Sequence, residues 1–194
     1  MKQFSVKKLQ VWALVIALFM AHLFFRSVAH ADEGGGWQAR ETLNGECFIA
    51  FPVAPQLLQQ SMKMADGNSR LNYDIYLAPF EDKGVFLLLI ATYPGMMPGG
   101  HETAGLEGLV RGIVGQQKEN TLVYANWVDH AGVPAVSFLV QNQTSYFRGH
   151  ALMIGNKLFL VAMEGRKGTL EENLFNRFLK SFHLQKPKSS VAPK

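Results

Sequence analysis

The sequence predicts an α+β domain in which an antiparallel β-sheet is sandwiched between helices. Short segments of alternating or continuous apolar character run through most of the chain and are joined by hairpin turns. Two segments have the 3.6-residue apolar spacing of helices, one in the middle of the chain and one near its end. The order is strands, one helix, four strands and one helix. This order favours an antiparallel sheet, because parallel sheets need strands and helices that alternate.

The first 31 residues have the three-part form of a secretory signal peptide. Three lysines within the first eight residues precede an apolar run over 9–25, and Ala29-His30-Ala31 supplies a small-x-small cleavage pattern. We therefore expect the mature chain to begin at Asp32 and to be exported, periplasmic or secreted. The alternative is an uncleaved anchor, because the apolar run is about as long as the shortest membrane-spanning helices. A membrane association is expected only in that case.

The charge balance of the remaining chain argues against nucleic-acid binding. Residues 1–31 contain four of the 19 Lys and Arg residues and none of the 15 Asp and Glu residues, so residues 32–194 carry 15 of each sign. We expect a flexible leader with a candidate edge strand over 32–44, one domain over 45–185, and a disordered basic tail over 186–194.

Cys47 is the only cysteine, so no intrachain disulfide can form. Cys47, Ile49 and Phe51 alternate along one side of a predicted strand, which indicates that the thiol is buried as a small apolar group. The alternative is an intermolecular disulfide or a reactive thiol, but no neighbouring motif supports it.

The sequence pattern predicts five strands before the first helix. Asp66-Gly67 is typical of a tight hairpin turn between the third and the fourth. The fifth is apolar at nearly every position, which predicts a central strand buried on both faces. The five ranges are Trp37–Leu43, Glu46–Phe51, Gln56–Met64, Arg70–Ala78 and Val85–Pro94.

A predicted helix over Glu102–Lys118 has two distinct stripes. One is apolar and is expected to lie on the sheet. The other consists of glycines, which weaken a helix by about 1 kcal/mol each relative to alanine. The glycines favour either close approach of another segment of this chain or a docking surface for a partner. The candidate partner surface comprises this stripe and two methionines of the preceding loop: Met96, Met97, Gly105, Gly108, Gly112 and Gly115.

The second half predicts four hairpin-linked strands and a closing helix. The strands are Thr121–His130, Val133–Asn142, Tyr146–Ile154 and Lys157–Glu164. The helix, over Leu170–Phe182, carries a continuous apolar stripe that is expected to close one face of the sheet. Thr169 and Glu172 have the spacing of a capping box at its start.

Polar residues of the second half give one candidate cluster. Tyr146, Arg148 and His150 share one side of a predicted strand, which indicates either a small polar cluster or an exposed polar side. His101, Asp129, His130, His150 and Cys47 have metal-ligating side chains, but nothing in their spacing brings them together. We therefore predict no catalytic, cofactor-binding or metal-binding residue, and we expect a non-enzyme rather than an enzyme.

Packing and turn signatures spread over roughly 46–184 resemble the PsbP-like superfamily. They are Phe51-Pro52, the hairpin at Asp66-Gly67, the strand Val85–Tyr93, the helix Leu106–Gln117, the turn Gly132-Val133-Pro134-Ala135, a strand with Tyr146 and Arg148, Lys157–Leu160, and Arg177–Leu184. That superfamily includes the extrinsic oxygen-evolving protein of photosystem II, a Ran-binding nuclear import factor and many small exported bacterial proteins. The resemblance implies an antiparallel sheet between helices, usually without a catalytic centre, and no binding residue carries over to a numbered position.

Two functions remain open from the sequence. The first is an exported, non-enzymatic binding or accessory protein of the cell envelope, acting on another envelope or secreted protein through protein–protein contacts. The alternative is an exported metal-dependent hydrolase, or a carrier of a metal or small ligand, that uses His101, Asp129, His130 or His150. The sequence identifies no cofactor for either.

Overall fold

The computed structural model describes residues 36–64, 66–81, 83–95 and 102–185. The predicted signal peptide over 1–31, Met96, Met97, His101 and the tail over 186–194 lie outside the described residues. Within the described part of the chain, no helix combines the length and the apolar character needed to cross a membrane.

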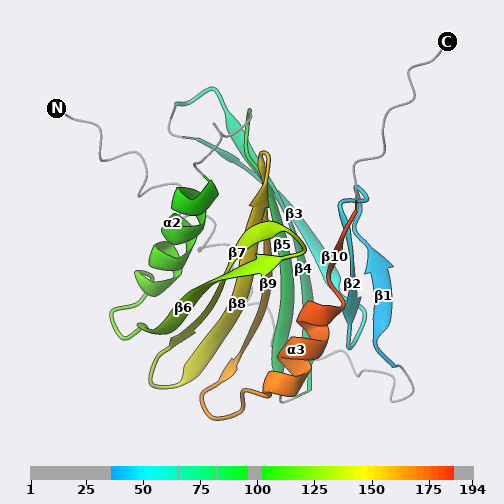
Figure 1. The fold of residues 1–194 in the computed structure, drawn as a ribbon, viewed down its shortest axis with the longest axis vertical. Helices are drawn as coiled ribbons and strands as arrows, with labels where there is room; N and C mark the ends of the chain where they lie inside the picture. Colours follow the sequence, from blue (N-terminus) through cyan, green and yellow to red (C-terminus); the bar gives the residue numbers. More distant parts are fainter. Residues whose placement is uncertain (1–35, 65, 82, 96–101, 186–194) are drawn as a thin grey trace.

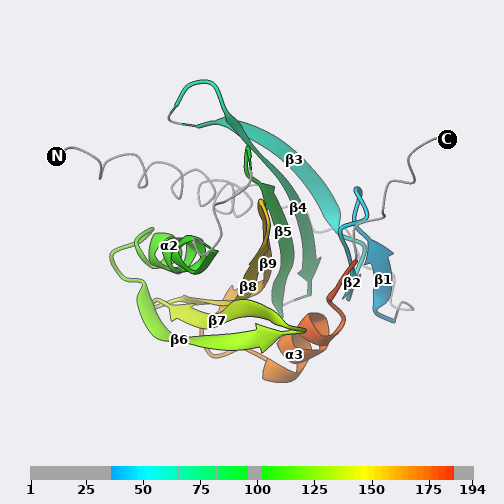
Figure 2. The same cartoon turned by 45° about the horizontal axis from the view of Figure 1, so that its top comes forward.

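The fold has three layers, with a large antiparallel sheet in the middle (Figures 1 and 2). The strands are β1 (Gln38–Glu41), β2 (Cys47–Phe51), β3 (Gln56–Lys63), β4 (Arg70–Phe80), β5 (Gly84–Thr92), β6 (Thr121–His130), β7 (Val133–Gln141), β8 (Ser145–Ile154), β9 (Lys157–Arg166) and β10 (His183–Leu184), and the helices are α2 (Glu102–Val114) and α3 (Glu172–Lys180). The large sheet has the order β3-β4-β5-β9-β8-β7-β6. Helix α2 covers one of its faces, and α3 covers the other together with a small sheet of order β1-β2-β10.

The path of the chain explains why β6 lies at an edge. Strand β5 pairs with β4, and α2 then carries the chain to the far side of the sheet. Strands β6 to β9 return by hairpins until β9 pairs with β5. The prediction that β5 is buried on both faces is confirmed, since Phe86–Ala91 are all buried. The middle strand of the sheet is β9, however, and not β5.

Each face of the large sheet has its own hydrophobic core. On one face, the buried side of α2 packs Leu106, Leu109 and Ile113 against alternate residues of the sheet. On the other face, Phe175 and Phe178 of α3 pack against the sheet and against β2. The apolar stripes predicted for both helices therefore face the sheet, as amphipathic helices do.

Three details of the prediction were wrong. The segment Cys47–Phe51 belongs to a separate small sheet, which the short β10 completes. Helix α3 begins only at Glu172, and its N-cap residue makes no side-chain hydrogen bond. Thr169 does not form a capping box, because its hydroxyl donates to the carbonyl oxygen of Arg166 in the preceding turn.

Candidate functional site

The predicted polar cluster lies in a row along β8. Tyr146, Arg148 and His150 are two residues apart, so their side chains point to the same face of the sheet, toward α3. They are not an exposed polar side: Tyr146 and His150 are buried, and Arg148 is half-buried. The row is therefore covered by α3 and by the segment that follows it.

The buried His150 forms a pair with His130, the half-buried last residue of β6. The two imidazole centroids are 5.0 Å apart, and the ring of Phe182 lies 5.3 Å from that of His130. His150 is 4% exposed, and neither of its ring nitrogens has a hydrogen-bond partner in the described part of the chain. Burial, followed by the charges of His130 and Arg148, lowers the pKa of His150 to about 4, so the imidazole is neutral at neutral pH.

Arg148 links β8 to α3 and β6. Its guanidinium carbon lies 4.9 Å from the ring centroid of Phe175 and 5.1 Å from that of Tyr124. One of its terminal nitrogens lies 3.4 Å from a carboxylate oxygen of Glu172. Burial lowers the pKa of Arg148, and Glu172 opposes that shift. Since the cation is held between two rings and one carboxylate, its contacts are structural.

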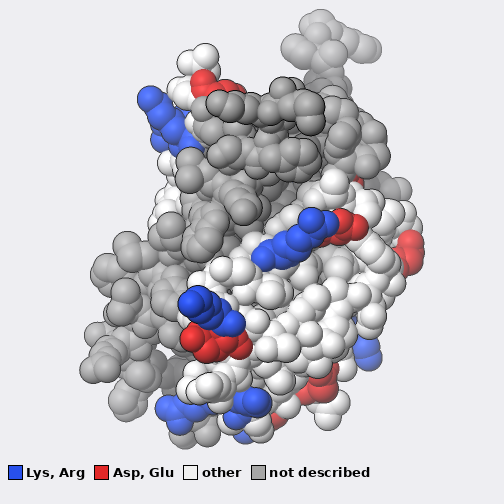
Figure 3. Space-filling view, turned by 90° about the vertical axis from the view of Figure 1, so that its left-hand side faces the viewer, with Lys and Arg blue, Asp and Glu red and all other residues white. Residues whose placement is uncertain are grey.

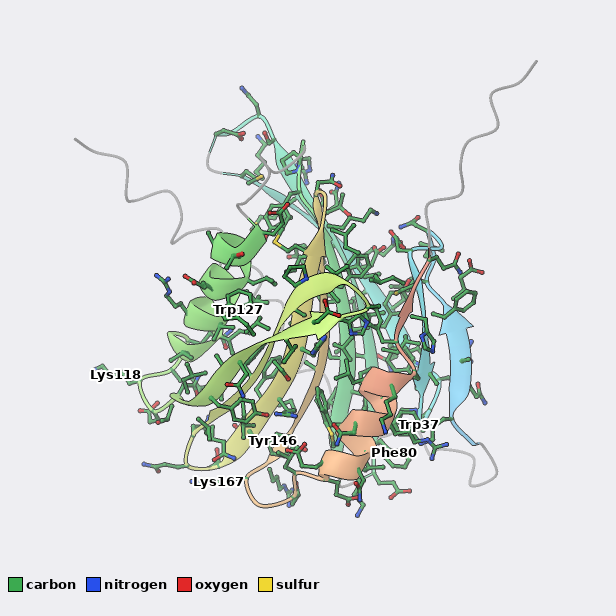
Figure 4. The ribbon with its side chains drawn as sticks, in the orientation of Figure 1. Trp37, Phe80, Lys118, Trp127, Tyr146 and Lys167 are labelled. Atoms are coloured by element: carbon green, nitrogen blue, oxygen red, sulfur yellow. The ribbon has the colours of Figure 1, made fainter. Side chains whose placement is uncertain are left out.

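Tyr146 stands apart from the other two residues at the far end of the row. Figure 4 shows it near the loop that joins β9 to α3. Its hydroxyl donates a long hydrogen bond of 3.5 Å to the carbonyl oxygen of Lys83. Burial, together with Glu171, Glu164 and Glu172, raises the pKa of Tyr146 to about 12. This phenol is therefore unsuited to proton transfer at neutral pH.

The structure brings together only two of the residues with metal-ligating side chains that the sequence analysis named. His130 and His150 come together, although the sequence spacing does not indicate it. Zinc sites take three or four protein ligands. In residues 36–64, 66–81, 83–95 and 102–185, no three His, Cys, Asp or Glu side chains are placed to hold one ion. The described arrangement thus offers two neutral imidazoles and no complete metal site.

Cys47 is buried, as predicted, and is fully inaccessible to solvent. Burial raises the pKa of its thiol to about 12. The thiol group lies against the hydroxyl of Thr42, 4.0 Å away. A buried protonated thiol is unreactive, so Cys47 is neither a nucleophile nor a site for an intermolecular disulfide in the native fold.

Two hollows lie at the ends of the sheet. One, of about 50 Å³, lies at the carboxyl end of α2 beside Asn120 and Asn142, and it has room for water molecules only. The other, of about 800 Å³, is open and lies between the turn after β1 and the β8–β9 hairpin. At its wall Lys157 donates to Glu46 over 2.8 Å, so these two charges are already paired.

The glycine stripe of α2 lies at the surface. Gly105, Gly108 and Gly112 are partly exposed, and a side chain added at Gly108 would meet no atom within 4 Å. Gly115 lies just beyond the end of the helix. Close approach of another described segment therefore does not explain Gly108. Its role as a partner surface stays a prediction, together with Met96 and Met97, which lie outside the described residues.

The free edge of β6 is the feature that the sequence analysis missed. Strand β6 pairs with β7, and no other described strand lies on its outer side. Four large apolar side chains on it are exposed, and we call them the β6 edge: Leu122 at 41%, Val123 at 52%, Trp127 at 48% and Val128 at 37%. Figure 3, which views the side where α2 lies, shows only scattered charged side chains over the described part of that surface.

The sequence contains a pattern that marks this edge, but the pattern can be interpreted only when the order of strands in the sheet is known. Adjacent apolar pairs, Leu122-Val123 and Trp127-Val128, give the strand apolar residues on both faces. That pattern usually indicates an interior strand. Trp127 pairs with Val136 of the core beneath α2 and so lies on the same side of the sheet as that helix, as Figure 4 shows.

Comparisons with known proteins identify the fold. No family model matches the sequence, and no curated protein matches it. The solution structure of a cyanobacterial PsbP, CyanoP from Synechocystis, superposes with a TM-score of 0.51 at 13% identity and covers 81% of this chain and 99% of that chain. A crystal structure from Bacteroides thetaiotaomicron gives a TM-score of 0.45 at 10% identity and covers 78% of this chain and 49% of that chain. The superposition on the cyanobacterial protein shows a PsbP-like fold.

Proposed function

We propose that this chain of PsbP-like fold is an exported, non-enzymatic binding or accessory protein of the cell envelope that acts through protein–protein contacts. The observation that carries the proposal is the β6 edge. Neighbouring apolar side chains that are exposed at a protein surface mark interaction sites. Tryptophan is enriched among the residues that contribute most of the binding energy at such sites.

The backbone of β6 adds to this surface. An edge strand presents unpaired N–H and C=O groups that can hydrogen-bond to a strand of another protein. Between Thr121 and Val128 the strand has no charged residue and no proline, the usual features that prevent such pairing. Export is supported by the signal-like residues 1–31, and the balanced charge of residues 32–194 fits a protein partner better than a nucleic acid.

Capture of a partner tests this proposal directly. Residues 32–194 would be used as bait in native envelope extract, with crosslinking and mass spectrometry. We expect the double variant Leu122→Ser and Trp127→Ser to lose about tenfold or more of the captured partner, because the change removes two large apolar contacts. Both side chains are about half exposed, so the melting temperature should change little.

The opposite edge of the sheet supplies a matched control. Leu57 and Leu58 on β3 are each 38% exposed, so Leu57→Ser with Leu58→Ser removes a similar apolar area from the other edge. A third variant, Gly108→Gln, tests the glycine stripe of α2 in the same experiment. Equal capture by the β6 and β3 variants would remove the β6 edge from the proposal.

The alternative function is a metal or small-ligand carrier, or a metal-dependent hydrolase. The contact between His130 and the buried His150 is the observation that favours it, since a neutral imidazole nitrogen can bind a metal. Metal analysis of protein purified without an affinity tag distinguishes the two functions. Stoichiometric zinc or copper that disappears in His150→Ala, but not in His183→Ala, would replace the accessory role with the carrier.

A further inference from the structure

The larger of the two hollows lies between two turns that carry exposed apolar side chains. Leu43, in the turn after β1, is 60% exposed, and Ile154, at the end of β8, is 43% exposed. Phe159 and Leu184 also line this hollow, which we call the hairpin hollow. Its volume of about 800 Å³ is within the range of small-molecule sites, which are mostly apolar with a few polar groups.

Hydrogen bonds hold both walls of the hairpin hollow in place. In the turn after β1, the backbone N–H of Leu43 donates to the hydroxyl of Tyr76 on β4 over 2.8 Å. In the β8–β9 hairpin, the side-chain amide of Asn156 donates to the carbonyl oxygen of Tyr93 over 2.8 Å. The backbone N–H of Tyr93 donates to the carbonyl oxygen of Asn156 over 2.9 Å. Because both turns are tied to strands of the large sheet or their ends, Leu43 and Ile154 stay apart, and the apolar surface between them is preformed for a ligand.

Among the described residues, three charged side chains line the hairpin hollow, and two of them cancel. Lys157 donates to Glu46 over 2.8 Å, and the other carboxylate oxygen of Glu46 accepts from the hydroxyl of Thr42 over 3.0 Å. The third is Glu41, of which one carboxylate oxygen accepts from the side-chain amide of Gln185 over 2.9 Å. Glu41 makes no ion pair in the described part of the chain. The hollow therefore keeps one uncompensated negative charge.

This charge decides which kind of ligand suits the hairpin hollow. An anionic head group would be repelled by Glu41, and Lys157 is already paired with Glu46. A cationic head group can pair with the exposed carboxylate of Glu41. An apolar group on the same molecule can cover Leu43 and Ile154, which removes exposed apolar surface from water.

We propose that the hairpin hollow binds a small apolar molecule that carries one positive charge, such as an alkyl amine. The apolar part lies between Leu43 and Ile154, and the ammonium group pairs with the carboxylate of Glu41. The site shares no residue with the β6 edge or with the His130–His150 contact. It therefore goes beyond the proposed function, and its failure would leave that function untouched.

Titration with three probes of similar chain length tests both parts of the site. Octylammonium, octanol and octanoate differ mainly in the charge of the head group. They are titrated into isotope-labelled residues 32–194 at neutral pH and low salt, and NMR spectroscopy gives both the place and the affinity of binding. We expect the backbone amides of Gly45 and Asn156, which line the hollow, to shift. Octylammonium should bind about tenfold more tightly than octanoate, with octanol between them.

Two variants separate the charge from the apolar walls. Glu41→Gln should bring the affinities of octylammonium and octanoate within about twofold of each other, because an amide carries no net charge. Leu43→Ser with Ile154→Ser should weaken the binding of all three probes by about tenfold or more. The control, Leu57→Ser with Leu58→Ser on β3, should leave every affinity unchanged. All these side chains are exposed, and circular dichroism melting curves confirm that the variants fold.

Each other outcome overturns the proposal. No binding, shifts that lie elsewhere, or affinities that survive Leu43→Ser with Ile154→Ser would remove the hairpin hollow as the site. Equal affinities of the three probes, or tighter binding of octanoate, would show that Glu41 does not select a cation. Residues 186–194 are the competing occupant, because they contain three lysines and follow Gln185 at the hollow. If their deletion raised the affinity for octylammonium by about tenfold or more, the chain itself would occupy the hollow in place of a free ligand.

Discussion

Replacement of Phe178 with alanine is expected to lower the free energy of unfolding by about 3–5 kcal/mol. The side chain is fully buried and joins α3 to β5, to β2 and to the segment before β1. Its ring centroid lies 5.1 Å from that of Phe86 on β5, 5.2 Å from that of Phe51 on β2 and 6.3 Å from that of Trp37 before β1. Removal of the ring leaves a cavity between α3, β5 and β2, which cannot all close on it.

Urea denaturation of the parent and variant measures this loss as a shift of the midpoint. A domain of this size has a free energy of unfolding of roughly 5–15 kcal/mol, so the variant should lose a large share of it. Phe48→Ala is the matched control, because Phe48 lies on β2, which contacts Phe178 through Phe51, but its own side chain is 40% exposed. We expect it to cost less than about 1 kcal/mol. Similar losses in the two variants would mean that α3 is not anchored through Phe178.

The sequence predicted the elements well because their signals are local. The hairpin turn at Gly67 and the apolar stripe that contains Phe175 and Phe178 each follow from a few neighbouring residues. The membership of sheets is not local. The separate sheet of β1, β2 and β10 depends on β10, whose two residues, His183 and Leu184, are too short for a periodic signal.

The candidate site shows the same limit. The shared side of Tyr146, Arg148 and His150 was predicted, because alternation along one strand is a local property. The meeting of His130 with His150 depends on the order β6-β7-β8 in the sheet and on the packing of Phe182 against His130. The exposure of Trp127 depends on which strand ends the sheet. Neither is encoded in the spacing of residues along the chain.

The stability of the protein is expected to fall by about 3 kcal/mol as the pH is lowered from 6.5 to 4, through the protonation of His150 alone. The ordinary pKa of histidine is near 6.5, and burial beside His130 and Arg148 lowers that of His150 to about 4 in the folded state. Between these values the unfolded chain binds a proton that the folded chain does not. The contribution of neutral His150 to the free energy of unfolding is therefore complete above pH 6.5 and is lost as the pH falls from 6.5 to about 4.

Two other groups with shifted pKa values, His130 and Glu46, also make the stability depend on pH. Burial also lowers the pKa of His130, so its protonation adds to the loss at acid pH, although Asp129 opposes this shift. The pKa of Glu46 is lowered as well. Burial raises this pKa, but the hydrogen bonds from Lys157 and Thr42 and the positive charge of Lys157 outweigh the effect of burial. Glu46 therefore contributes a loss only when the pH falls below the ordinary range of glutamate.

His150→Leu isolates the contribution of the buried imidazole. Leucine is apolar and similar in volume, and the ring nitrogens of His150 make no hydrogen bond in the described structure that the change would break. Urea denaturation from pH 7 to pH 4.5 should show a shallower loss of stability in His150→Leu than in the parent. His183→Gln removes an exposed imidazole whose charge helps to lower the pKa of His130, and it leaves the burial of His150 unchanged, so its loss of stability should stay close to that of the parent. A parent-like loss in His150→Leu would show that acid acts through other groups, and that the His130–His150 contact does not couple the end of β6 to proton binding.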